Sequence, residues 1–131
     1  FIPLSIKLEA EISELEQNEK ESFLKDLGIN QPALEKLIKT SYNSLGLGTF
    51  FTAGEKEVRS WIIKKGSLAP EAAGVIHTDF QKGFIRAEVI SFEDYIAHEG
   101  DQGAKIAGKL RSEGSEYVVN EGDVILFRFN V

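Results

Sequence analysis

The chain has 131 residues, of which 42% are hydrophobic and 27% charged, a composition typical of one folded domain or of a small domain with an appendage. Its formal net charge of −6 opposes the non-specific nucleic-acid binding that basic proteins show. It contains no cysteine, which excludes disulfides, thiolate zinc sites and a cysteine nucleophile. No run approaches the roughly 18–20 apolar residues of a membrane span, so no membrane partner is expected, and a cytoplasmic location is taken as the default.

The sequence begins with Phe and contains no Met, which indicates a fragment of a longer protein. Residues 1–48 carry 5 Lys and Arg against 8 Asp and Glu, and residues 49–131 carry 10 against 13. Neither part therefore has a basic excess, so a surface that binds RNA would have to be a local basic stripe.

Residues 1–48 are predicted to form one strand and three helices. The apolar segment 1–5 is predicted to be a short strand. Helical periodicity and end signals predict helices within 8–17, at about 19–27, and from Pro32 to the glycines of 46–48. Because a lone strand needs partners for its backbone groups, this region is interpreted as the end of a larger α/β domain.

Residues 49–131 have a strand-rich pattern. Strands are predicted at 49–54, 57–66, 83–90 and within 121–131, with helices at 67–77, 91–100 and the start of 101–114, which continues as a strand or loop. Parity along 83–90 places Phe84 and Arg86 on the face opposite Ile85 and Ala87. The order predicts an α+β fold: a mixed sheet with helices across one face, in a β-grasp (ubiquitin-like) arrangement.

His77 and Asp79 could form the acid–base couple of a small hydrolase. No G-x-S-x-G elbow accompanies them, so the preferred interpretation is structural: His77 ends a helix, and Thr78 or Asp79 caps the next turn. The hydrolase alternative predicts that His77→Ala abolishes activity and leaves the fold intact. His77 and His98 lack the spacing of a metal-binding pair, so no metal site is predicted.

A second candidate site is a basic and aromatic sheet face that would bind RNA by stacking and phosphate contact. Its members would be Arg59, Trp61, Lys64, Lys65, Lys82 and Arg86. The alternative is that Trp61 lies in the core and the lysines are ordinary loop ends. A third candidate is the turn at Ser5, Ile6 and Lys7, whose backbone N–H groups could contact a purine base. The P-loop motif G-x-x-x-x-G-K-[ST] is absent from the sequence.

The run AAGVIHTDFQKGFIRAEVI at 72–90 and the terminal GDVILFRFNV resemble the C-terminal TGS domain of the YchF subfamily of Obg-like P-loop NTPases. The resemblance covers all of 49–131, and SYNSLGLGTFFTAG and LEAEISEL also fit that family. It implies that residues 49–131 form a TGS domain of β-grasp fold. Residues 1–48 would then be the last strand and helices of the nucleotide-binding domain.

The resemblance further implies the C-terminal fragment of a ribosome-associated, redox- or stress-linked ATPase that also binds GTP. ATP and Mg²⁺ would belong to the intact parent, and this chain alone would hold no cofactor and be inactive. Only Ser5, Ile6 and Lys7 would match a base-contacting turn, and Ile6 departs from the small residue usual there.

The expected partners are RNA, the ribosome or a protein bound by the TGS domain, and the chain's own nucleotide domain. In the absence of that domain we expect the apolar faces of residues 1–48 to drive dimerisation. The alternative is a free-standing ubiquitin-like protein-interaction module without nucleotide chemistry.

Overall fold

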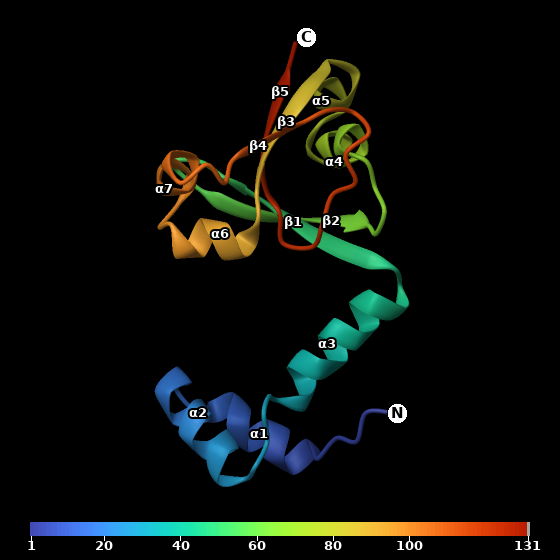
Figure 1. Ribbon diagram of the computed structural model, residues 1–131. Coiled ribbons are helices and arrows are strands. Elements are labelled where there is room, and N and C mark those ends of the chain that lie inside the picture. The colour runs from blue at the N-terminus through green and yellow to red at the C-terminus, as the bar shows by residue number, and fades with distance from the viewer. Residues whose placement is uncertain (131) are drawn as a thin grey trace. The chain divides into compact units, whose positions relative to one another are not determined.

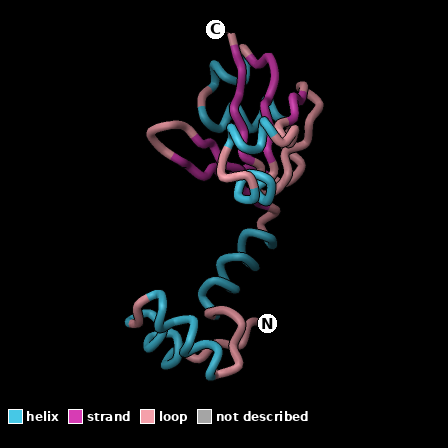
Figure 2. The backbone as a smooth tube through the Cα atoms, turned by 60° about the vertical axis from the view of Figure 1, so that its left-hand side comes forward, coloured by secondary structure: helices cyan, strands magenta, loops and turns pink. Residues whose placement is uncertain are grey.

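The computed structural model describes residues 1–130 and divides the chain into two compact units, one of residues 1–45 and one that begins at Gly46. The first unit contains helices and loops, and every strand described belongs to the second (Figure 2). The assignment of these units to a nucleotide-binding domain and a TGS domain stays a prediction.

The first unit is formed by α1 (Ile6–Glu14), α2 (Gln17–Asp26) and α3 (Ala33–Ser44). Its apolar interior is small, with Ile12 of α1 and Leu24 of α2 as its buried residues. The Glu9 carboxylate accepts hydrogen bonds from the backbone N–H groups of Ala33 (2.8 Å) and Leu34 (3.4 Å). These are among the N–H groups that a helix leaves unpaired at its start, so Glu9 ties α1 to the first turn of α3.

The prediction of a strand at residues 1–5 is wrong. This segment precedes α1 and forms no strand. Pro3 has no backbone N–H to donate, and no strand of the described chain pairs with the segment. Ser5 instead begins the helix, since its hydroxyl oxygen accepts a hydrogen bond from the N–H of Leu8 at 3.4 Å.

The described residues of the second unit, 46–130, form five strands and four helices. They are β1 (Leu47–Ala53), β2 (Val58–Lys64), α4 (Ala69–Ile76), α5 (Thr78–Lys82), β3 (Phe84–Ile90), α6 (Phe92–Ala97), α7 (Asp101–Ile106), β4 (Arg111–Glu113) and β5 (Val124–Phe129). The strands form one sheet in the order β2-β1-β5-β3-β4 (Figure 1). β1 is parallel to β5, and the other neighbours are antiparallel. The predicted mixed α+β sheet is confirmed, and its β-grasp classification stays a prediction.

The main core lies between the sheet and α4. Phe50, Val89 and Ile125 are fully buried on this face of the sheet, against the alanines of α4, which are Ala69, Ala72 and Ala73. Small side chains let the helix approach the strands closely, and Phe50 packs edge-on against Phe127 with ring centres 5.9 Å apart. This core fixes which side chains of each strand face outward.

The opposite face of the sheet is the side of α6 and α7 (Figure 1), whereas the sequence predicted helices across one face only. This face also carries apolar side chains, and Phe51 of β1 packs against Phe92 of α6 with ring centres 6.0 Å apart. Burying such rings requires a second layer, because an apolar sheet face is unfavourable in water.

A register irregularity between Phe84 and Arg86 reverses the parity predicted for β3. Phe84 packs on the core face together with Ala87, although the sequence placed them on opposite faces. Because a bulge inserts one unpaired residue, side chains before and after it no longer alternate in the simple period of two. Arg86 consequently shares the outer face with Glu88.

Candidate binding surfaces

Arg59 and Trp61 of β2 form a cation–aromatic pair. The Arg59 guanidinium lies 5.3 Å from the centre of the Trp61 ring, and the indole Nε1–H donates to Thr52 Oγ1 at 2.9 Å. Trp61 is partly buried and packs against the main core. The ring thus packs on the core and also lies against a cation, so a nucleobase would compete with Arg59 to stack on it.

Lys64 and Lys65 lie at the end of β2, beside an open hollow of about 520 Å³. The hollow runs between β2 and α4, with Ile63 and Val75 contributing apolar walls and Glu71 a carboxylate. Glu71 also accepts a hydrogen bond from the N–H of Leu68 at 2.8 Å, so it caps α4. The two lysines therefore flank a surface depression of mixed character.

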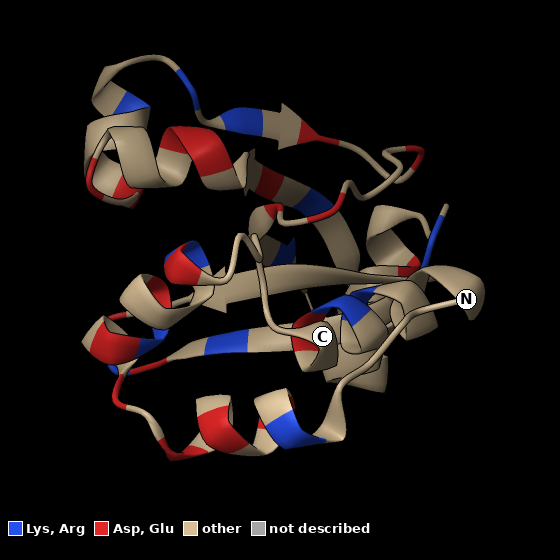
Figure 3. Cartoon of the chain, turned by 90° about the horizontal axis from the view of Figure 1, so that it is seen from below, with Lys and Arg blue, Asp and Glu red and all other residues tan. Residues whose placement is uncertain are grey.

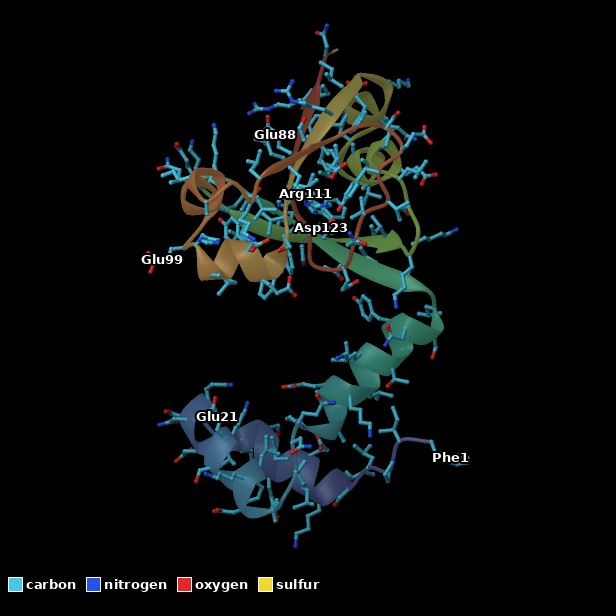
Figure 4. All side chains as sticks on the ribbon, viewed as in Figure 1. Phe1, Glu21, Glu88, Glu99, Arg111 and Asp123 are labelled. Atoms are coloured by element: carbon cyan, nitrogen blue, oxygen red, sulfur yellow. The ribbon has the colours of Figure 1, made fainter. Side chains whose placement is uncertain are left out.

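Arg86 lies on β3, which β1 and β5 separate from β2 in the sheet. It pairs with Glu88 at 3.3 Å, and Arg128 of β5 pairs with the other oxygen of the same carboxylate at 3.1 Å. The hydrogen bond from Arg128, aided by the one from Arg86, holds the pKa of Glu88 below its usual value although partial burial opposes this. Two arginines share one carboxylate, which leaves this cluster (labelled by Glu88 in Figure 4) with a net positive charge.

The six predicted residues do not form one cluster. Arg59 and Trp61 are in contact, Lys64 and Lys65 follow on the same strand, Lys82 ends α5, and Arg86 belongs to the Glu88 cluster. Sequence analysis missed Arg128, although the alternation of Leu126, Phe127 and Arg128 indicates a cation on the outer face of the last strand.

Glu88 and Arg128 also border a hollow of about 280 Å³ on the outer face of the sheet. Tyr95 of α6 and Lys105 of α7 line its other side. Lys105 and Arg128 give this hollow two cations, and Glu88 and Asp101 give it two carboxylates, so its lining is mixed in charge. Acidic and basic residues are otherwise mixed over helices and strands (Figure 3).

His77 has a structural role, as the sequence indicated, but it acts as the cap itself. It ends α4 and begins α5, a helix that the sequence analysis interpreted as a turn capped by Thr78 or Asp79. Its Nδ1 accepts a hydrogen bond from the N–H of Asp79 at 3.1 Å, which requires that nitrogen to be unprotonated. Nδ1 is bound to backbone, and among residues 1–130 no nucleophile is hydrogen-bonded to the ring, so the pair forms a helix start.

Asp123 anchors a polar network that the sequence did not predict (Figure 4). Its side chain is 3% exposed, and Oδ2 accepts from the Tyr117 hydroxyl at 2.7 Å and from the N–H of Asn120 at 2.9 Å. Arg111 lies 3.9 Å from the other oxygen and donates to the Tyr117 hydroxyl at 3.2 Å. Burial and the bond to Asp123 raise the pKa of Tyr117. The network is internally satisfied, so it stabilises the loop before β5.

Ser5, Ile6 and Lys7 lie in the other unit, at the start of α1. Ser5 caps this helix, and Ile6 is 79% exposed. The turn is therefore accessible, with first-turn N–H groups of the kind that bind polar ligands. Contact with a purine base stays a prediction.

Residues 1–130 contain neither a metal-binding cluster nor a helix that could span a membrane. No group of three or more histidine, aspartate or glutamate side chains in this part of the chain is arranged to hold a metal ion. None of its helices is both long enough and apolar enough to cross a membrane.

Residues 47–130 match the family model YchF-GTPase_C, described as a protein of unknown function (DUF933). The chain is 60% identical over 130 residues to the ribosome-binding ATPase YchF of Bacillus subtilis, covering 99% of this chain and 36% of that protein. It is 48% identical over 129 residues to Obg-like ATPase 1 of Pongo abelii, covering 98% and 32%. The chain thus spans about a third of the length of these curated relatives.

Among solved structures, the YchF GTPase of Schizosaccharomyces pombe superposes with a TM-score of 0.84 at 40% identity, covering 98% of this chain and 34% of that one. A GTP-binding protein of Pyrococcus horikoshii gives a TM-score of 0.52 at 20% identity over 87% of this chain and 29% of that one, a likeness of fold alone.

Proposed function

The chain belongs to the YchF-GTPase_C family, and on that premise we propose that it is the C-terminal part of a ribosome-binding ATPase of the YchF type. The observation that carries this proposal is 60% identity across 99% of the chain to a relative named for that activity. ATP or GTP, with Mg²⁺, would be held by the part of the relatives that this chain does not span, since the sequence has no P-loop motif. Ser5, Ile6 and Lys7 would supply at most a contact to the base.

In this proposal the unit that begins at Gly46 is a TGS domain of β-grasp type that docks the protein on the ribosome. Its contact residues would be Arg59, Trp61, Lys64, Lys65, Lys82 and Arg86, joined by Arg128. Exposed cations on a rigid sheet suit contact with phosphate groups, which position a protein without reading sequence. A cytoplasmic location and a redox- or stress-linked role follow from the resemblance and belong to the same proposal.

For docking on ribosomal RNA, contact of cations with phosphate groups is favoured over stacking of bases on Trp61. The Trp61 ring is already covered by Arg59, whereas Lys64 and the Arg86–Glu88–Arg128 cluster present positive charge at the surface. A protein-interaction module without nucleotide chemistry is the alternative, and it would bind its partner with little dependence on salt.

Co-sedimentation with ribosomes tests the proposal. We expect Lys64→Glu combined with Lys65→Glu, and separately Arg86→Glu combined with Arg128→Glu, to weaken binding about tenfold or more, with a shallower salt dependence. Lys20→Glu combined with Lys25→Glu makes the same charge change in the helical unit and is the matched control.

Equal binding by all three double variants would contradict docking through the sheet unit. Binding lost in the sheet variants but insensitive to salt would favour the protein-interaction alternative. Circular dichroism of each variant separates lost contacts from lost folding.

A further inference from the structure

The two edges of the sheet differ in length. The edge strand β4 has 3 residues, whereas β2 at the other edge has 7. Within residues 1–130, β2 pairs with β1 alone. A long edge strand presents a row of unpaired backbone groups to which another strand can add.

The hydrogen-bond pattern of the β1–β2 hairpin identifies those groups. Gly54 N–H donates to Glu57 at 2.9 Å, and Lys65 N–H donates to Gly46 at 2.8 Å. In an antiparallel pair the hydrogen-bonded positions alternate along each strand. Between these two bonds, the backbone N–H and C=O groups of Arg59, Trp61 and Ile63 therefore face β1. The N–H and C=O groups of Val58, Ser60 and Ile62 therefore point away from the sheet.

The side chains around Ser60 are complementary to a second copy of themselves. If two β2 strands meet antiparallel with Ser60 opposite Ser60, then Val58 of each copy lies opposite Ile62 of the other. Val58 is 68% exposed and Ile62 47% exposed, and β-branched pairs across strands stabilise a sheet. On the other face, Arg59 lies opposite Trp61, the same cation–aromatic pair that forms within one chain at 5.3 Å.

The charges at the two ends of β2 select this orientation. Glu55, Lys56 and Glu57 precede the strand and leave this end with one net negative charge, and Lys64 and Lys65 end it. Antiparallel pairing brings the acidic end of one copy to the basic end of the other, whereas parallel pairing would bring like charges together. The backbone and apolar groups thus favour this register, and the net charges of the strand ends favour the antiparallel orientation, with Glu55 opposite Lys65 offset in part by Lys56 opposite Lys64.

We propose that two copies of this chain associate through β2, antiparallel and centred on Ser60, to form one continuous sheet. The interface is isologous, because each copy contributes the same strand. It consists of few residue pairs on each side, so the association is weak and depends on protein concentration.

Cross-linking through a single thiol tests the register. The chain has no cysteine, so Ser60→Cys introduces the only thiol, at the two-fold axis. Directly opposed bonded residues have Cα atoms about 5.5 Å apart, within the range of a disulfide. We expect Ser60→Cys to give at least about tenfold more reducible covalent dimer under mild oxidation than Ser112→Cys, placed at the exposed centre of β4. Equal yields would overturn the proposal.

Sedimentation of the unmodified chain tests the association itself. Ser60→Pro removes an N–H that points away from β1, so it leaves the hairpin ladder intact and blocks the centre of the interface. From about 10 μM to about 1 mM we expect the sedimentation coefficient of the native chain to rise and that of Ser60→Pro to stay constant, with equal circular dichroism. A monomeric native chain throughout, or a dimer that persists in Ser60→Pro through the faces of the helical unit, would overturn the proposal.

Discussion

The two units differ in how they bury their apolar residues. The sheet unit has a continuous core from Phe50 to Phe127, whereas the helical unit buries Ile12 and Leu24. α3 has the apolar stripe of an amphipathic helix, yet Leu37 and Ile38 are exposed and none of its residues is buried. Because burial of apolar surface is the main stabilising contribution, the sheet unit should be stable by itself and the helical unit marginal.

The largest expected effect is a core truncation in the sheet unit. Phe50→Ala removes a fully buried ring and should lower the free energy of unfolding by about 3–5 kcal/mol. Leu37→Ala on α3 is the matched control, because it removes an apolar side chain that is already half exposed, and should cost less than about 1 kcal/mol. Denaturant unfolding measures both, followed by Trp61 fluorescence for Phe50→Ala and by far-ultraviolet circular dichroism for Leu37→Ala, and comparable losses would contradict the difference between the units.

The next effect concerns the buried polar network of the sheet unit. Asp123→Ala leaves the Tyr117 hydroxyl and the Asn120 N–H without their acceptor and should cost about 2–3 kcal/mol. Glu116→Ala, an exposed acidic position on the same loop, should change stability by less than about 0.5 kcal/mol. A small effect of Asp123→Ala in the same unfolding experiment would show that the network holds no part of the fold.

The regular elements could be predicted from sequence because their signals are local. Alternation and turn residues predicted β1, β2, β3 and β5, and apolar periodicity with stop signals predicted α1 to α3. The strand at residues 1–5 failed because a strand depends on a partner, which local pattern does not supply. α5 was missed because one residue, His77, both ends a helix and starts the next.

The arrangement of the candidate site could not be predicted in the same way. The order of the strands in the sheet separates Arg86 from Arg59, and the bulge in β3 decides on which face of the sheet Arg86 lies. The local spacing of residues predicts neither the strand order nor the bulge. The Arg111, Tyr117 and Asp123 network joins residues across a loop whose path depends on the tertiary fold.

A smaller effect is expected in the helical unit. Trp61 is the only tryptophan and lies in the sheet unit, so its fluorescence distinguishes unfolding of that unit from unfolding of the helical unit. Glu9→Ala removes the acceptor for the first N–H groups of α3 and should destabilise this unit by about 1 kcal/mol. Far-ultraviolet circular dichroism should then show an earlier loss of helix, with Trp61 fluorescence unchanged. Glu11→Ala, exposed on the same helix, should leave both signals as they are, and a shift of the Trp61 transition in Glu9→Ala would mean that the units unfold together.

The smallest effect is a pH dependence of the sheet unit. The pKa of Glu88 is held below its ordinary value of 4.5 in the folded chain, so the unfolded chain binds this proton first as pH falls. Its stabilising contribution is complete above pH 4.5 and is lost as pH falls through the lower folded value. Glu88→Gln should therefore flatten the acid side of the stability curve for the Trp61 transition. Glu93→Gln, an exposed position on α6, should not, because the bonds to Arg86 and Arg128 are made by Glu88. Identical acid slopes in the two variants would mean that solvent screens the arginines from the Glu88 carboxylate.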